Sequence, residues 1–146
     1  MDSAQVAHQL RIDEGERLRV YKDTKGHLTV GVGHKVLPED ALHLGDTISG
    51  SRCLLLLWAD IAHAVEICQA LWPDFDTYPE EVQEILCNMA FNLGKGGLAK
   101  FHDLLRCVKN CAWSAAASAM RDSVWYGQVG ARAQRLARRM ENVNNG

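Results

Sequence analysis

The 146-residue sequence lacks an excess of charge of either sign. It contains 16 Lys and Arg residues and 18 Asp and Glu residues, for a formal net charge of -2. This balance excludes an overall basic protein, and aromatic residues are not interleaved with basic ones as they are on nucleic-acid-binding surfaces. We therefore expect no nucleic-acid partner.

Paired cysteines and clustered metal ligands are also missing. The five cysteines form no CxxC pair, and the closest two, Cys107 and Cys111, have a spacing that suits one helix face and not a disulfide within one helix. An odd number of scattered cysteines with mostly apolar neighbours indicates reduced thiols in the core of a protein made in a cytosol. No four ligands occur at zinc-binding spacing, so we expect no metal site.

Signals for secretion or membrane insertion are not found either. Residues 1–11 lack the basic start and apolar run of a signal peptide, and 18 apolar residues never occur in succession. We expect synthesis in the cytoplasm. With 47% hydrophobic and 23% charged residues, the composition is globular, and the length fits one compact domain or two small lobes.

Residues 12–34 form the most informative stretch. Two runs of alternating apolar and polar residues, separated by turn residues at 23–26, predict a β-hairpin. In the second strand Thr29 would share a face with Gly31 and Gly33. Such a face either leaves room for a ligand against the backbone or marks a twist or bulge. The alternating apolar positions are Leu18, Val20, Leu28, Val30 and Val32.

Two carboxylates flank the first strand of this hairpin. Glu14 lies at the end of the predicted first helix, and Asp23 follows the first strand. Paired carboxylates suit glycoside hydrolysis, in which a protonated acid donates to the leaving oxygen and an ionised one activates water. Asp13 is a competing candidate for the acid. Among 18 acidic residues the spacing alone is a weak motif.

From Leu10 to His34 the sequence resembles the active-site segment of the phage-type lysozymes, glycoside hydrolase family 24, and of its T-even members in particular. The family pattern of Glu, eight residues, Asp, five residues and Thr is met by Glu14, Asp23 and Thr29. Agreement over so many consecutive positions is far more specific than a three-residue pattern. Further matching positions, which make the resemblance nearly full-length, are residues 88–94, Trp125, Tyr126, Gln128, Arg132 and Arg135.

The resemblance implies a peptidoglycan hydrolase that cleaves the β-1,4 bond between N-acetylmuramic acid and N-acetylglucosamine without metal or cofactor. Glu14 would protonate the leaving oxygen, while Asp23 and Thr29 activate a water that attacks from the opposite face with inversion. Substrate contacts are implied at Gly31, Lys35, Phe91 and Asn92. Supporting ion pairs are implied for Arg132 with Glu14, Arg135 with Asp13, and His34 with Asp60.

Several positions depart from the T-even members of the family. His27 and Leu28 replace two tyrosines, and Leu104 and Ala119 replace polar residues that face the sugar. These changes put subsite affinity and wall preference in doubt. Two other classes stay open: a lytic transglycosylase, which needs only the acid, and a non-catalytic peptidoglycan-binding module.

Four arginines lie close to the end of the sequence. They are a candidate contact for an anionic membrane or wall polymer, or else a solvated helix face. We expect a monomer that reaches the wall once the membrane is permeabilised, for which phage lysozymes typically rely on a holin. The arginines are Arg132, Arg135, Arg138 and Arg139.

The predicted fold is α+β and lysozyme-like, with a small hairpin lobe joined by a long helix to an all-helical lobe. Within one domain, 1–146, the hairpin lobe covers 13–50 and the linking helix about 50–72. The helical lobe covers 73–146 together with an N-terminal helix, 3–14. The apolar face of the linking helix is predicted at Leu54, Trp58, Ile61, Val65 and Cys68. Core positions are expected for Trp58, Trp72, Trp113 and Trp125.

Overall fold

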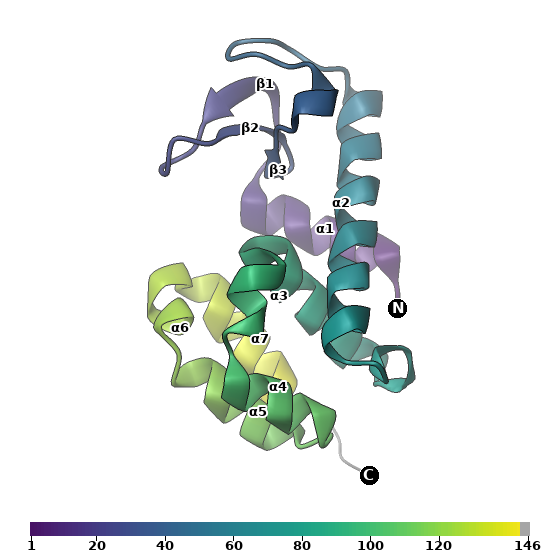
Figure 1. Cartoon of the computed structure of the whole chain (residues 1–146), viewed down its shortest axis with the longest axis vertical. Helices are drawn as coiled ribbons and strands as arrows, with labels where there is room; N and C mark the ends of the chain where they lie inside the picture. Colours follow the sequence, from purple (N-terminus) through teal and green to yellow (C-terminus); the bar gives the residue numbers. More distant parts are fainter. Residues whose placement is uncertain (144–146) are drawn as a thin grey trace. The chain divides into compact units, whose positions relative to one another are not determined.

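The computed structural model describes residues 1–143. The last three residues of the predicted helical lobe, 144–146, lie outside the described residues. Contacts divide the chain into a sheet unit, Ser3–Ala62, and a helical unit formed by Met1–Asp2 and the residues from His63 onward. A three-stranded antiparallel sheet, one long helix and a series of further helices follow one another along the chain, which confirms the predicted α+β class (Figure 1).

The sheet unit begins with helix α1, Ser3–Glu14, which buries Val6, Ala7 and Leu10. The helix ends where Gly15 adopts a positive φ of 73°, a conformation that glycine reaches without steric cost. Contacts group α1 with the sheet, whereas the sequence analysis grouped it with the helical lobe. Glu14 is the last helical residue before the first strand.

The sheet consists of β1 (Arg17–Lys22), β2 (Leu28–Gly31) and β3 (His34–Lys35) in the order β1-β2-β3. The predicted hairpin corresponds to β1 and β2. The strand β3 was not predicted, because two residues are too few to show an alternation. In the ladder Thr29 lies opposite Tyr21 of β1 and opposite Lys35 of β3.

Two interpretations were open for the Thr29 and Gly31 face of β2, and the packing at Gly31 favours close approach of the backbone. Thr29 is only 2% exposed, and Gly31 is buried. A Cβ atom placed on Gly31 would come within 3.2 Å of the Cys53 sulfur on the following helix. The lack of a side chain at Gly31 therefore serves close packing against α2, and the predicted substrate contact at Gly31 stays a prediction.

The long helix α2, Gly50–Leu71, begins in the sheet unit and ends in the helical unit. Ser49 caps it, since its hydroxyl accepts the backbone N–H of Arg52 at 3.0 Å. The predicted apolar face is confirmed at Ile61 and Cys68 and wrong at Leu54 and Trp58, which are each 38% exposed. The buried stripe consists of Cys53, Leu57, Ile61, Ala64, Ile67 and Cys68. By length and composition alone α2 could cross a membrane, but such a stripe is equally typical of a core helix.

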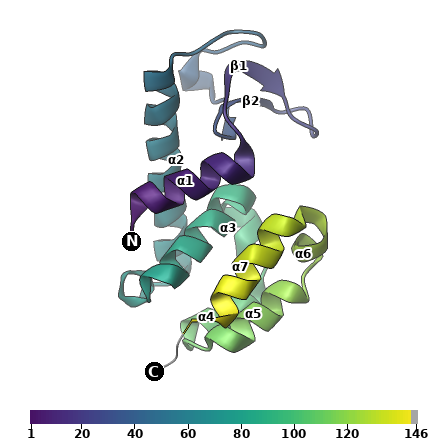
Figure 2. The ribbon, with the colours of Figure 1, turned by 180° about the vertical axis from the view of Figure 1, so that it is seen from behind.

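The helical unit packs its C-terminal helix, α7 (Ala131–Glu141), against α3 (Glu80–Ala99) and α5 (Trp113–Arg121), as Figure 2 shows. Helix α3 bends at Gly94, which has non-helical backbone angles. The sequence analysis missed the six-residue helix α6, Val124–Val129, whose cap is the hydroxyl of Ser123. The remaining elements are the short 3-10 helices η1 (Pro38–Asp40) and η2 (Phe75–Thr77) and helix α4 (His102–Lys109).

Candidate active site

Asp23 is fixed by the turn that joins β1 to β2. One of its carboxylate oxygens, Oδ1, accepts the backbone N–H groups of Lys25 at 2.9 Å and of His27 at 2.8 Å. Its own backbone N–H donates to the carbonyl oxygen of His27 at 2.9 Å. The sequence 23–26 folds this way because an aspartate side chain readily bonds to backbone two residues on, and Gly26 supplies a positive φ. Asp23 therefore has one oriented carboxylate.

The second oxygen of Asp23, Oδ2, accepts a hydrogen bond from the ammonium group of Lys35 on β3. The hydrogen bond from Lys35 is the main reason why the pKa of Asp23 lies well below its ordinary value, and the backbone N–H groups of His27 and Lys25 act in the same direction. A carboxylate in this setting stays ionised even in acid, as a base that activates water must.

Thr29 lies next to this pair in the sheet, opposite Lys35 in the β2–β3 ladder. Its hydroxyl donates to the carbonyl oxygen of His27 at 3.1 Å, so that its orientation is set by the same turn that holds Asp23. Of the predicted site residues, the structure thus brings together Asp23, Thr29 and Lys35.

Glu14 lies against the turn between β2 and β3. A Cβ atom placed on Gly33 would meet Glu14 Oε2 at 2.5 Å, and Gly33 also has a positive φ of 63°. Only a glycine fits this position, because any other side chain would both strain the backbone and displace the carboxylate. Gly33, noted in the sequence for its place beside Thr29, is needed for the close approach of Glu14.

His34 follows directly and lies between two carboxylates. Its Nδ1 is 2.7 Å from Asp60 Oδ2, the partner implied by the resemblance, and its Nε2 is 2.7 Å from Asp40 Oδ2. Burial alone would lower the pKa of His34, but the hydrogen bonds with Asp60 and Asp40 outweigh it and raise the pKa above its ordinary value. Sequence reasoning missed Asp40, although its place after a Leu-Pro turn six residues beyond His34 was visible.

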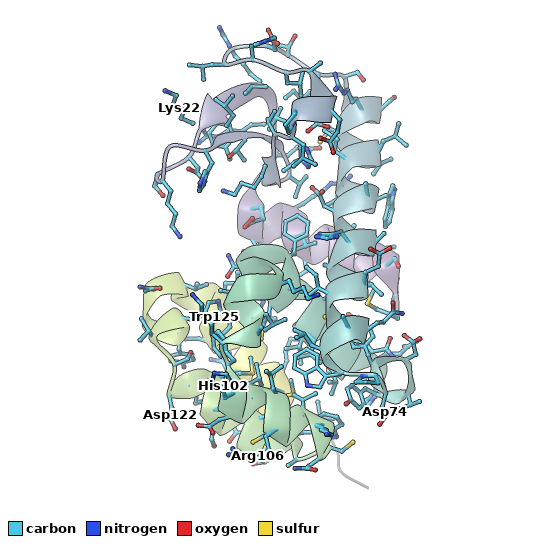
Figure 3. All side chains as sticks on the ribbon, viewed as in Figure 1. Lys22, Asp74, His102, Arg106, Asp122 and Trp125 are labelled. Atoms are coloured by element: carbon cyan, nitrogen blue, oxygen red, sulfur yellow. The ribbon has the colours of Figure 1, made fainter. Side chains whose placement is uncertain are left out.

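In the helical unit, the predicted contact residue Asn92 holds a tryptophan in place. Its side-chain oxygen accepts the indole N–H of Trp125 at 2.9 Å, while Phe91 is half-buried and Asn92 exposed. Trp125 is labelled in Figure 3. The ring of Phe101 meets Trp125 edge-on with centroids 6.0 Å apart.

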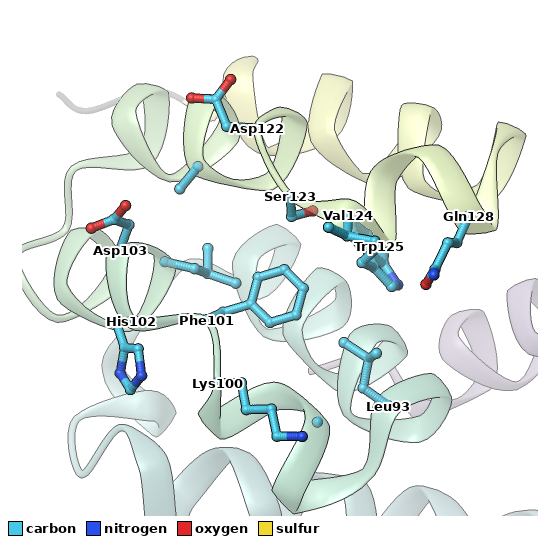
Figure 4. A pocket seen from close by; sticks show the side chains of 13 residues that line it. Leu93, Lys100, Phe101, His102, Asp103, Asp122, Ser123, Val124, Trp125 and Gln128 are labelled. Carbon is cyan, nitrogen blue, oxygen red and sulfur yellow. The ribbon is translucent and has the colours of Figure 1, made fainter.

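A hollow of about 580 Å³ lies beside this tryptophan (Figure 4). Phe101, Trp125 and Leu93 form apolar parts of its wall, and Asp103 and Asp122 also line it. Leu104 and Ala119 contribute to the wall as well, so the two departures from the T-even pattern make this hollow more apolar.

The C-terminal arginines do not form one free cationic surface. Arg132 is buried, with Nε 2.8 Å from the side-chain oxygen of Asn88, and Arg139 pairs with Glu81 at 2.6 Å and Glu84 at 3.4 Å. Arg138 is exposed. The implied pairs of Arg132 with Glu14 and of Arg135 with Asp13 connect residues of different units and stay predictions.

A metal site is not apparent in the described part of the chain. Within residues 1–143, no group of three or more His, Cys, Asp or Glu side chains is placed to hold a metal ion.

Comparison with known proteins gives this geometry a context. The family model described as phage lysozyme matches residues 11–142. The chain belongs to the phage lysozyme family. The predicted resemblance and the lysozyme-like fold are thereby confirmed, and at the level of the family the chain is a peptidoglycan-degrading glycoside hydrolase.

Individual relatives of this lysozyme-family chain come from phages and from an amoeba. It is 32% identical to the pre-baseplate central spike protein Gp5 of Enterobacteria phage T4, over 90% of this chain but only 26% of Gp5. It is 28% identical to the probable T4-type lysozyme 2 of Dictyostelium discoideum, over 87% of this chain and 88% of that protein. The endolysin of Salmonella phage P22 is 30% identical over 62% of each chain.

Proposed function

We propose that this lysozyme-family chain cleaves the β-1,4 bond between N-acetylmuramic acid and N-acetylglucosamine in peptidoglycan by an inverting reaction. Glu14 gives its proton to the leaving glycosidic oxygen. Asp23 accepts a proton from the water that attacks the anomeric carbon from the opposite face, and Thr29 helps to orient that water. Neither step uses a metal or an organic cofactor.

The observation that carries this proposal is the state of Asp23. Its carboxylate is oriented by two backbone N–H groups and kept ionised by Lys35. A hydrogen-bonded turn aspartate of this kind occurs in many proteins, but here it lies at the family spacing from Glu14 and in the turn that leads into the strand of Thr29. The agreement of spacing, charge and fold supports the role of base.

Phe91 and Asn92 are proposed to contact the substrate, with Asn92 acting partly through Trp125. We also propose that the chain is made in the cytoplasm and reaches the wall after the membrane is permeabilised. The anionic-polymer contact proposed for the C-terminal arginines rests on Arg138 alone, since Arg132 and Arg139 have partners within the chain.

The first test removes each acid while keeping its shape. Glu14→Gln and Asp23→Asn should each lower the initial rate of peptidoglycan hydrolysis by at least about 10²-fold, the usual contribution of an acid or base. Glu39→Gln is the matched control, because Glu39 is exposed on η1. Wall clearing by Glu14→Gln at the rate of the unchanged protein would disprove the assignment.

The second test distinguishes the reaction from its alternatives. Mass spectrometry of the released fragments should give reducing ends with one added water per cut, and proton NMR at early times should show the inverted anomer. Fragments ending in 1,6-anhydromuramic acid would identify a lytic transglycosylase. Binding to purified peptidoglycan without any fragments would identify a binding module.

A further inference from the structure

Lys35 is directed at the proposed base, although the sequence analysis expected it to contact the substrate. Its ammonium group bonds to Asp23 Oδ2, and among the residues the structure describes it has no other acidic partner within ion-pair distance. The strand register explains the contact, because Lys35 lies opposite Thr29 and the turn at Asp23 closes the neighbouring hairpin.

The two oxygens of Asp23 are held from two directions. The backbone N–H groups of Lys25 and His27 bond to Oδ1, and the Lys35 side chain bonds to Oδ2. The backbone N–H groups of the turn bond to Oδ1 alone. Lys35 on β3 supplies the contact that completes the orientation of the group.

One further titratable side chain faces Asp23. The His27 ring lies with Nδ1 3.5 Å from Asp23 Oδ2 and is 61% exposed. Among described residues, the basic side chains within ion-pair distance of this carboxylate are His27 from the turn and Lys35 from β3. Lys22, adjacent in sequence, has no such contact and projects outward from β1 (Figure 3).

We propose that Lys35 is a positioning residue for hydrolysis, whose ammonium group holds the Asp23 carboxylate in place and charged, so that the enzyme keeps its activity in acidic surroundings. The inference rests on the proposed function and deepens it. Lys35 neither gives nor takes a proton.

The reaction step shows why this matters. As the attacking water forms its bond to the anomeric carbon, the glycosidic bond breaks, the leaving oxygen takes the proton of Glu14, and Asp23 takes a proton from the water. Asp23 can do so only when it is ionised at the start. For each pH unit by which the midpoint of Asp23 protonation is lowered, the pH range of full activity extends one unit further toward acid.

The test compares Lys35→Met with the unchanged protein in two measurements. In carbon-13 NMR of the carboxyl group, the titration midpoint of Asp23 should rise by about one pH unit or more, the usual effect of losing a neighbouring cation. In the pH profile of kcat, the acidic limb should move up by the same amount, so that the rate at the low-pH end falls about tenfold relative to the rate at neutral pH.

Matched variants separate this role from a general loss of charge or structure. Lys35→Arg keeps the cation and should keep most of the original profile, whereas Lys22→Met removes one lysine beside Asp23 in sequence and should leave both measurements unchanged. Making Lys35→Met also in a His27→Asn background shows that the shift does not come from the imidazole.

The two readouts also distinguish failure of this inference from failure of the proposed function. An Asp23 midpoint that is the same in Lys35→Met and in the unchanged protein overturns the inference, whatever the activity. A shifted midpoint with an unshifted acidic limb overturns it too, because Asp23 would not then control the rate. If the unchanged protein cleaves no peptidoglycan, the proposed function fails, and the inference fails with it.

Discussion

At the scale of single residues, His34 shows how two acids can hold one imidazole charged. It is 5% exposed and lies 2.7 Å from both Asp40 and Asp60. The pKa of His34 is raised above its ordinary value by these hydrogen bonds. Burial alone would raise the pKa of Asp40, but its bond to His34, the backbone N–H of Leu37 and the nearby positive charges together lower it. The contacts favour the charged form of both partners.

The stability of the protein should therefore depend on pH through His34. Because the pKa of His34 is raised in the folded protein, its contribution to stability is complete below the unfolded-state pKa of about 6.5 and is lost as pH rises through the folded-state pKa. Because the pKa of Asp40 is lowered, its contribution is lost in strong acid. His34→Asn should cost about 2 kcal/mol of unfolding free energy near pH 5.5, the usual worth of a hydrogen bond between charged groups, and clearly less near pH 8.5.

Urea unfolding at the two pH values checks this, with His63→Asn as the control. His63 is 73% exposed and makes only a 3.9 Å contact with Glu66. Its replacement should change little at either pH. A cost for His34→Asn that grows with rising pH would contradict the assignment of charge.

At the scale of elements, α2 offers a matched comparison within one helix. Leu57 is 1% exposed and Leu55 is 70% exposed. Both substitutions to Ala change helix propensity equally, so the difference between them reports burial alone. Leu57→Ala should lower the free energy of unfolding by about 2–5 kcal/mol, and Leu55→Ala should change it by less than about 0.5 kcal/mol.

Chemical denaturation of both variants measures these costs. Equal costs would contradict the assignment of Leu57 to the buried stripe and of Leu55 to the exposed side of α2. The apolar residues of α2 are too many to locate the stripe from sequence, because LLLLW at 54–58 is apolar on every side of the helix. This explains why the prediction chose Leu54 and Trp58 where the buried residues are Cys53 and Leu57, although it was right at Ile61 and Cys68.

Among the other elements, those with strong local sequence signals could be predicted, and those with weak signals could not. Helix ends at Gly15 and Ser49, and the turn at residues 23–26, were predictable from capping and turn chemistry. Strand β3 and helix α6 were not, because two and six residues are too short to show a period. Their positions depend on tertiary contacts, such as the ladder between Thr29 and Lys35.

At the scale of the whole molecule, the resemblance covers nearly the full chain and indicated where the acids are, but not what surrounds them. The contact of Lys35 with Asp23 joins residues 12 positions apart, and it depends on where β3 lies in the fold. The contact of Asp40 with His34 joins residues 6 positions apart, and it depends on where η1 lies. Spacing in the sequence carries no signal for such pairs, since either side chain could equally have faced solvent.

The five cysteines can serve as a probe of the whole chain. Cys53, Cys68 and Cys87 are buried, whereas Cys107 is half-buried and Cys111 exposed, and all five are free thiols. Burial raises the pKa of Cys53 to about 11 and of Cys87 to about 12, and also raises that of Cys68. Since the thiolate is the reactive form, these three should be inert in the folded protein.

Iodoacetamide at neutral pH should therefore add at most two labels to the native protein, on Cys111 first and then on Cys107, and five in denaturant. Peptide mass spectrometry assigns the sites, and a Cys111→Ser variant, which should lose only the first label, is the control. Labelling of Cys68 or Cys87 as fast as Cys111 would show that the core around α2 and α3 opens readily. If the core is closed as described, the third label appears far more slowly than the first two, and its rate reaches the rate of unfolding once the reagent concentration is high enough for labelling to outpace reclosing.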